Sequence, residues 1–118
     1  MNFSNFVVPS ELEFFENFGV EPEDSSPADG FWSYRFGGDS GVSLVLSFDQ
    51  HARSIQTTLF LGNRELSTVS HEGSKELAIV AVDGRAQLVG VCESKEEVTE
   101  LTVETDPICV RWASLRTE

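Results

Sequence analysis

From residue 31 onward, apolar and polar residues alternate with the period of two that is typical of β-strands. In residues 42–48, for example, Val, Leu, Leu and Phe occupy every second position. Segment 76–82 is almost wholly apolar, which predicts a strand that is central or covered on both faces. Eight segments are predicted as strands: residues 31–36, 42–48, 54–61, 65–71, 76–82, 85–92, 98–104 and 108–114.

Short turns separate these segments, and Asp83-Gly84 is a strong signal for a two-residue hairpin. Short connections require antiparallel neighbours, because parallel strands need a long crossover. The pattern therefore predicts an antiparallel β-meander of about six to eight strands, with one face buried and the other largely wet. Residues 94–97 are compatible with a loop or with a brief helical turn.

One short helix is predicted before the strands. Ser10 and Glu13 form an S-x-x-E capping box, and Pro9 discourages an earlier start. Gly19 is well placed to end the helix. A helix of two to three turns is not stable alone, so it must dock on the sheet. The fold class is therefore α+β, with one short N-terminal helix packed on the meander.

The apolar face of this helix is predicted to contain Leu12 and Phe15, with Phe14 and Phe18 as further candidates. We expect Leu12 and Phe15 to be buried against the sheet. The segment that follows, residues 21–30, is predicted to be a polar loop because it contains two prolines and mostly acidic or small polar residues.

The length of 118 residues fits a single domain, residues 1–118. Cys92 and Cys109 could pair if their strands were neighbours, but two reduced thiols are the favoured interpretation because disulfide-dependent secreted domains usually carry more cysteines. The N-terminal segment has no basic region followed by a long apolar region, so it does not resemble a signal peptide. These features predict a cytoplasmic protein without a membrane span.

The net charge is the sequence feature that says most about the partner. The formal net charge is −12, and seven acids precede the first base, Arg35. A second acidic run, residues 93–106, is interrupted only by Lys95. Such a charge repels nucleic acid and anionic lipid and attracts basic proteins and metal cations. We therefore expect a basic protein partner, with no nucleic acid and no membrane; the pattern does not specify an oligomeric state.

The sequence contains no motif for catalysis or for a cofactor. His51, His71 and the two cysteines lack zinc-ligand spacing, and residues 21–30 lack the spacing of a calcium loop. Residues 37–41, GGDSG, resemble a serine-protease nucleophile sequence only superficially, and a glycine-rich hairpin loop explains them. We therefore predict a protein that is not an enzyme and that has no catalytic, cofactor-binding or metal-binding residues.

The acidic loop and the aromatic strand after it are the candidate partner-binding region. Acids beside aromatic residues are typical of interface hot spots. The alternatives are that the acids only form a solvated face and that the aromatic strand is packed on both faces. The candidate partner-binding residues are Glu21, Glu23, Asp24, Asp29, Trp32 and Tyr34.

Residues 43–62, SLVLSFDQHARSIQTTLFLG, followed by further strands and an I-x-V-x-W strand at Ile108, Val110 and Trp112, resemble small acidic immunity proteins of bacterial contact-dependent inhibition and related polymorphic toxin systems. The resemblance extends over residues 42–112. It implies a cytoplasmic antitoxin that binds a cognate toxic domain, often a nuclease, and covers its active site. It assigns no binding residue by motif.

Two other functions remain open at this stage. A small ligand-binding or enzymatic β-domain would have a concave apolar pocket between helix and sheet, with a few converging polar groups. A nucleic-acid mimic or structural subunit would use the same acids on a flatter surface.

Overall fold

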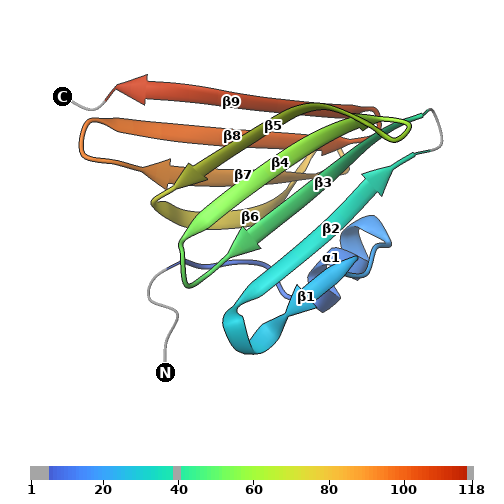
Figure 1. Cartoon of the computed structure of the whole chain (residues 1–118), viewed down its shortest axis with the longest axis horizontal. Coiled ribbons are helices and arrows are strands. Elements are labelled where there is room, and N and C mark those ends of the chain that lie inside the picture. Colours follow the sequence, from blue (N-terminus) through green and yellow to red (C-terminus); the bar gives the residue numbers. More distant parts are fainter. Residues whose placement is uncertain (1–5, 39–40, 117–118) are drawn as a thin grey trace.

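The computed structural model of the chain describes residues 6–38 and 41–116 (Figure 1). Asp39 and Ser40, in the predicted glycine-rich loop, lie outside the described residues, as do residues 1–5. The elements are α1 (Glu11–Phe18), β1 (Asp24–Ser26), the 3-10 helix η1 (Pro27–Asp29), β2 (Phe31–Gly37), β3 (Val42–Asp49), β4 (Ser54–Leu61), β5 (Arg64–Glu72), β6 (Ser74–Val82), β7 (Arg85–Glu93), β8 (Glu97–Thr105) and β9 (Ile108–Arg116).

The strands form two antiparallel sheets instead of the single sheet that was predicted. The first sheet has the order β1-β2-β3-β4-β5 and the second has the order β6-β7-β8-β9. Figure 1 shows the two sheets as separate layers whose strands cross obliquely. Each sheet is a meander of sequential neighbours, as predicted, but the described residues form nine named strands and not six to eight.

The passage from one sheet to the other occurs at Gly73, between β5 and β6. Its φ is 78°, and a Cβ here would overlap the carbonyl group of Glu93. The Gly73 carbonyl accepts a 2.8 Å hydrogen bond from Glu93 N–H, and Ser74 N–H donates a 2.9 Å bond to the Arg53 carbonyl. The backbone is therefore held to both sheets at this corner. The turn at this corner brings the apolar faces of the two sheets together. One eight-residue helix could not cover a sheet face by itself.

The core lies between the two sheets. Ile55 of the first sheet points at Gly90 of β7, where a Cβ would lie 3.0 Å from the Ile55 Cδ1 atom. Gly90 therefore allows the sheets to approach closely. Trp112 of β9 also joins the sheets, because its Nε1–H donates a 3.0 Å bond to Thr57 Oγ1 and its ring stacks on His71 at 4.7 Å. Other buried residues of the two inner faces are Leu44, Leu46, Phe48, Leu77, Leu88, Leu101 and Val103.

α1 begins and ends as the sequence predicts. Ser10 N–H donates to Glu13 Oε1 at 2.9 Å, and Glu13 N–H donates to Ser10 Oγ at 3.1 Å, which completes the capping box. Gly19 adopts φ 70°, and its N–H donates to the Phe15 carbonyl at 2.9 Å. No helix within residues 6–38 and 41–116 is long and apolar enough to span a membrane.

The predicted buried face of α1 was wrong. Phe14 is fully buried, with its ring centroid 3.8 Å from that of Tyr34 and 6.0 Å from that of Phe48. By contrast, Leu12 is 63% exposed and Phe15 is 54% exposed. Residues 14 and 18 are one helical turn apart, and at 3.6 residues per turn the pair of residues 12 and 15 is centred about 110° around the helix from them, so the rotation that buries Phe14 leaves Leu12 and Phe15 largely exposed.

The segment predicted as a polar loop contains two short elements. β1 pairs with β2, with Asp24 opposite Ser33 and Ser26 opposite Phe31. η1 follows and ends at Gly30, which adopts φ 72°. The first sheet therefore gains an edge strand of three residues from a segment whose composition indicates only turns.

β6 was predicted to be central or covered on both faces, and this prediction was also wrong. β6 is an edge strand of the second sheet, supported in part by a parallel bridge between Val7 and Glu76. Its outward residues Val80 and Val82 are exposed. The apolar run thus reflects a strand with Val80 and Val82 on its outer face and Leu77 and Ile79 on its inner face.

Phe14 is the side chain that docks α1, so Phe14→Ala should lower the free energy of unfolding by about 3–5 kcal/mol. Phe15→Ala, one residue away on the exposed side, is the matched control and should change it by less than about 1 kcal/mol. Urea unfolding of both variants measures the difference. Equal losses would show that the helix docks through another face.

Both cysteines are free thiols, as predicted, and they differ in access. Cys109 is exposed, whereas Cys92 is buried and shares a 3.2 Å hydrogen bond with Ser74. Burial raises the pKa of the Cys92 thiol, and the Ser74 bond partly opposes this shift. In the native protein, we expect a thiol reagent to modify one cysteine rapidly and the second only on unfolding; Cys109→Ser should abolish the rapid phase.

Candidate protein-binding surface

Acidic side chains gather on α1, on the loop after it, on β1 and on η1. All of them are exposed. Arg35 is the only Lys or Arg among the first 52 residues of the chain, so this end of the molecule has a strong excess of negative charge. We call it the N-terminal acidic surface, and its members are Glu11, Glu13, Glu16, Glu21, Glu23, Asp24 and Asp29.

Three of these carboxylates also make local hydrogen bonds that hold them in place. Glu13 belongs to the capping box of α1. Glu11 Oε2 accepts a 2.9 Å bond from the indole N–H of Trp32, and Asp29 Oδ2 accepts a 2.6 Å bond from the Ser26 hydroxyl. These acids are therefore oriented by the fold before any partner binds.

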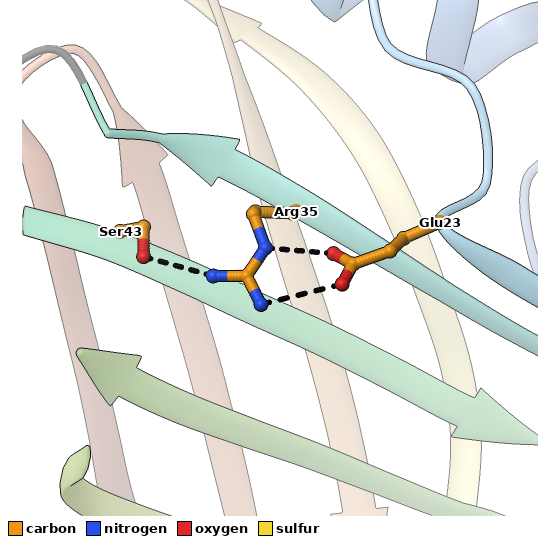
Figure 2. Close-up of polar contacts among 3 residues, drawn as sticks. All are labelled: Glu23, Arg35 and Ser43. Atoms are coloured by element: carbon orange, nitrogen blue, oxygen red, sulfur yellow. Dashed lines mark hydrogen bonds and ion pairs between the residues drawn. The ribbon is translucent and has the colours of Figure 1, made fainter. Parts of the chain in front are cut away.

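Glu23 forms the most ordered charge contact on this surface (Figure 2). Its two carboxylate oxygens accept hydrogen bonds from Arg35 Nε at 2.8 Å and Arg35 Nη2 at 3.3 Å. Arg35 Nη1 donates to Ser43 Oγ at 3.0 Å, and the guanidinium lies 5.2 Å from the ring centroid of Phe60. Because one predicted binding acid is paired within the molecule, the acidic loop does gain some contact energy on folding. Exposed pairs of this kind contribute little, about 0–1 kcal/mol.

The two predicted aromatic anchors are less exposed than the four predicted acids. Tyr34 is fully buried beneath Phe14, so the prediction that it could be an exposed anchor was wrong. Trp32 is half-buried, with its ring 5.8 Å from that of Phe48 and its N–H bonded to Glu11. Both aromatic residues share the inner face of β2, which α1 covers, and they hold the helix to the sheet.

The structure instead exposes two apolar residues that were predicted to be core. Leu12 and Phe15 lie three residues apart on the outer side of α1 and are therefore neighbours. Glu16 is one turn from Leu12, and Glu11 is one turn from Phe15. The pairing of Phe14 with Phe18 at i and i+4 was the signal in the sequence that could have revealed this orientation.

The second acidic run lies on the other sheet, where it is mixed with bases. Glu100 and Glu104 of β8 point outward, cross-strand from Ala113 and Cys109. Arg111 lies on the same face, opposite Thr102. Lys75 and Glu93 form a long ion pair at 3.9 Å. Charges of both signs on one face are typical of a solvated surface.

Two open hollows lie beside the end of α1, with volumes of about 680 Å³ and 590 Å³. Both include Phe18, Thr105 and Asp106 in their walls, and among the residues that the structure describes no His, Cys or Ser lines either. Across the described residues, no group of three His, Cys, Asp or Glu side chains could hold a metal ion. Such hollows do not provide the enclosed apolar pocket that a small-ligand site requires.

Comparison with known proteins identifies the fold. No family model matches the chain, and no curated protein matches it. Among solved structures, it is similar to a chain in a contact-dependent growth inhibition toxin–immunity protein complex from Klebsiella pneumoniae 342. The TM-score is 0.85 and the sequence identity is 21%, over 94% of this chain and 98% of that chain. The predicted resemblance is therefore confirmed at the level of the fold.

Tyr34 gives a testable consequence of how the helix is docked. Within the described part of the chain, its buried hydroxyl meets no hydrogen-bond partner. A buried unpaired hydroxyl is unfavourable, so Tyr34→Phe should leave the free energy of unfolding unchanged or raise it by about 1 kcal/mol. Denaturant unfolding at neutral pH measures this, and a loss above about 1 kcal/mol would contradict it.

The same hydroxyl predicts a pH dependence. Desolvation, and then the negative charge of Glu11, raise the pKa of Tyr34 to about 12. Above pH 10 the unfolded chain loses this proton while the folded protein keeps it, so stability falls as pH rises from about 10 to 12. The slope approaches about 1.4 kcal/mol per pH unit, and Tyr34→Phe should lack this component.

Proposed function

We propose that this chain is an immunity protein that binds and neutralises a cognate basic toxin domain. The observation that carries the proposal is the N-terminal acidic surface, in which seven acids precede a single arginine. The fold likeness to a chain of a toxin–immunity protein complex supports it. A protein whose charge is −12 needs an oppositely charged partner to make use of that surface.

Charge also indicates whether this chain corresponds to the toxin or to the immunity protein of such a complex. A toxin that cuts nucleic acid must grip phosphates, which requires Lys and Arg. This chain has 8 Lys and Arg against 20 Asp and Glu, so it would repel that substrate. The inhibitor is therefore the better assignment, and the protein acts by binding and not by catalysis.

The proposed mechanism follows from electrostatics. Carboxylates can occupy the positions of substrate phosphates and pair with the toxin's Arg and Lys side chains, which makes strong charge-assisted hydrogen bonds. A nuclease is accordingly the proposed toxin class, with its active site covered by the acidic surface. Opposite charges would also accelerate association. We place the protein in the cytoplasm, where it would meet a nuclease that has entered the cell.

The test combines charge removal with protection. In one variant, Glu21, Glu23, Asp24 and Asp29 become Gln or Asn. Its association rate with an inactivated cognate toxin domain, to be sought among the products of the genes that adjoin this chain's gene, should fall at least tenfold at low salt, because steering depends on charge. Wild-type binding should weaken as salt rises, whereas the variant should respond less. Surface plasmon resonance and a growth-protection assay measure both effects.

A matched control removes the same amount of charge from the second acidic run, through Glu96, Glu97, Glu100 and Glu104. The control should retain most of the association rate and full protection. If the control loses binding while the N-terminal variant keeps it, the interface lies on the second sheet. If wild-type protein neither binds nor protects, the proposed function is wrong.

A further inference from the structure

We propose that Leu12 and Phe15 of α1 form the apolar centre of the toxin interface and insert into an apolar groove that is rimmed by Lys and Arg on the partner. This inference rests on the proposed function and specifies its binding element. It assigns the contact to the outer side of the helix and not to the aromatic strand β2.

Other large apolar residues are also exposed, so exposure alone does not single out Leu12 and Phe15. Their position on the helix and the charges around them do. Phe15 is 54% exposed although the neighbouring Phe14 is fully buried, so the helix contributes large apolar side chains to two different sides. Among the described residues, the Phe14 side packs on the sheet, whereas Leu12 and Phe15 stay largely exposed. Two apolar side chains at i and i+3 on a helix are the pattern by which helices bind in grooves of partner proteins.

The helix presents these side chains rigidly. Its start is fixed by the capping box, its end by Gly19 in the left-handed conformation, and its rotation by the stack of Phe14 on Tyr34 at 3.8 Å. The Glu11–Trp32 bond adds a second link to the sheet. A rigid element loses little conformational freedom on binding, which favours affinity.

The charge of α1 indicates which charge its partner must carry. The helix carries Glu11, Glu13 and Glu16 and no base. A second copy of this chain would bring the same acids against them, so self-association through α1 is disfavoured. A basic rim around an apolar groove satisfies both the acids and the exposed side chains. The outer valines of β6, by contrast, lie on a sheet face that also carries Arg111, so charge does not select a partner there.

The experiment uses the full chain with Leu12→Ser and Phe15→Ser together. The probe is the same inactivated cognate toxin domain. Because both side chains are exposed, the unfolding midpoint should stay within experimental error of wild type. Affinity should fall by about 30-fold or more, mainly through faster dissociation, as is expected for a central apolar contact.

The matched control is Leu61→Ser with Leu66→Ser. These leucines of the β4–β5 hairpin are 51% and 55% exposed, close to the exposed fraction of Phe15. The control should bind like wild type. Equal affinity for the α1 variant would overturn this inference while leaving the immunity function intact. Wild-type protein that fails to bind the toxin domain would overturn both.

Self-association is a separate outcome. Sedimentation of the wild type and of the α1 variant, without toxin, reports whether a second copy occupies the helix face. A wild-type dimer that the two serine substitutions dissociate would replace the proposed occupant by another copy of this chain. A monomer in both cases agrees with a toxin as the occupant.

Discussion

The constraint on which the structure depends is that two sheets must bury their apolar faces against each other. Each sheet is a simple meander whose alternation leaves one apolar face, and neither could remain in water with that face uncovered. Gly73 allows the chain to turn from one layer to the other, and Gly90 gives Ile55 the space to pack between them. Trp112, bonded to Thr57, links the layers across β4 and β9.

The helix closes the side of this sandwich that the strands leave open. It does so through aromatic contacts of Phe14 with Tyr34 and Phe48 and of Phe18 with Phe36, and through the bond between Glu11 and Trp32. Among residues 6–38 and 41–116 the buried Tyr34 hydroxyl has no hydrogen-bond partner, a cost that the area of aromatic contact offsets. Because Phe14 faces inward, Leu12 and Phe15 must face outward. The exposed apolar pair is thus a direct consequence of how the core is completed.

The negative charge is compatible with this fold without being required by it. Glu13 and Asp29 make local hydrogen bonds near helix starts, Glu11 accepts a bond from Trp32 and Glu23 is paired with Arg35, but each of these carboxylates is exposed and the core does not depend on their charge. A similar fold is found at only 21% identity, which means that quite different sequences can satisfy the same core. The charged surface is therefore where the specific properties of this chain are to be sought.

The sequence by itself determined the local structure: the boundaries of eight strands to within two residues, their sequential antiparallel pairing except between segments 65–71 and 76–82, the capped helix and the sign of the surface charge. Each of these depends on near neighbours or on composition. Only the tertiary structure decided that the meander divides at Gly73, that β6 lies at an edge, and that segment 21–30 supplies β1. It also decided that Tyr34 is core while Phe15 is surface. These outcomes depend on which faces meet across the molecule. The i, i+4 pair Phe14 and Phe18 pointed to the observed orientation of the helix, but the i, i+3 pair Leu12 and Phe15 offered a competing apolar face, and contact with the sheet decided between them.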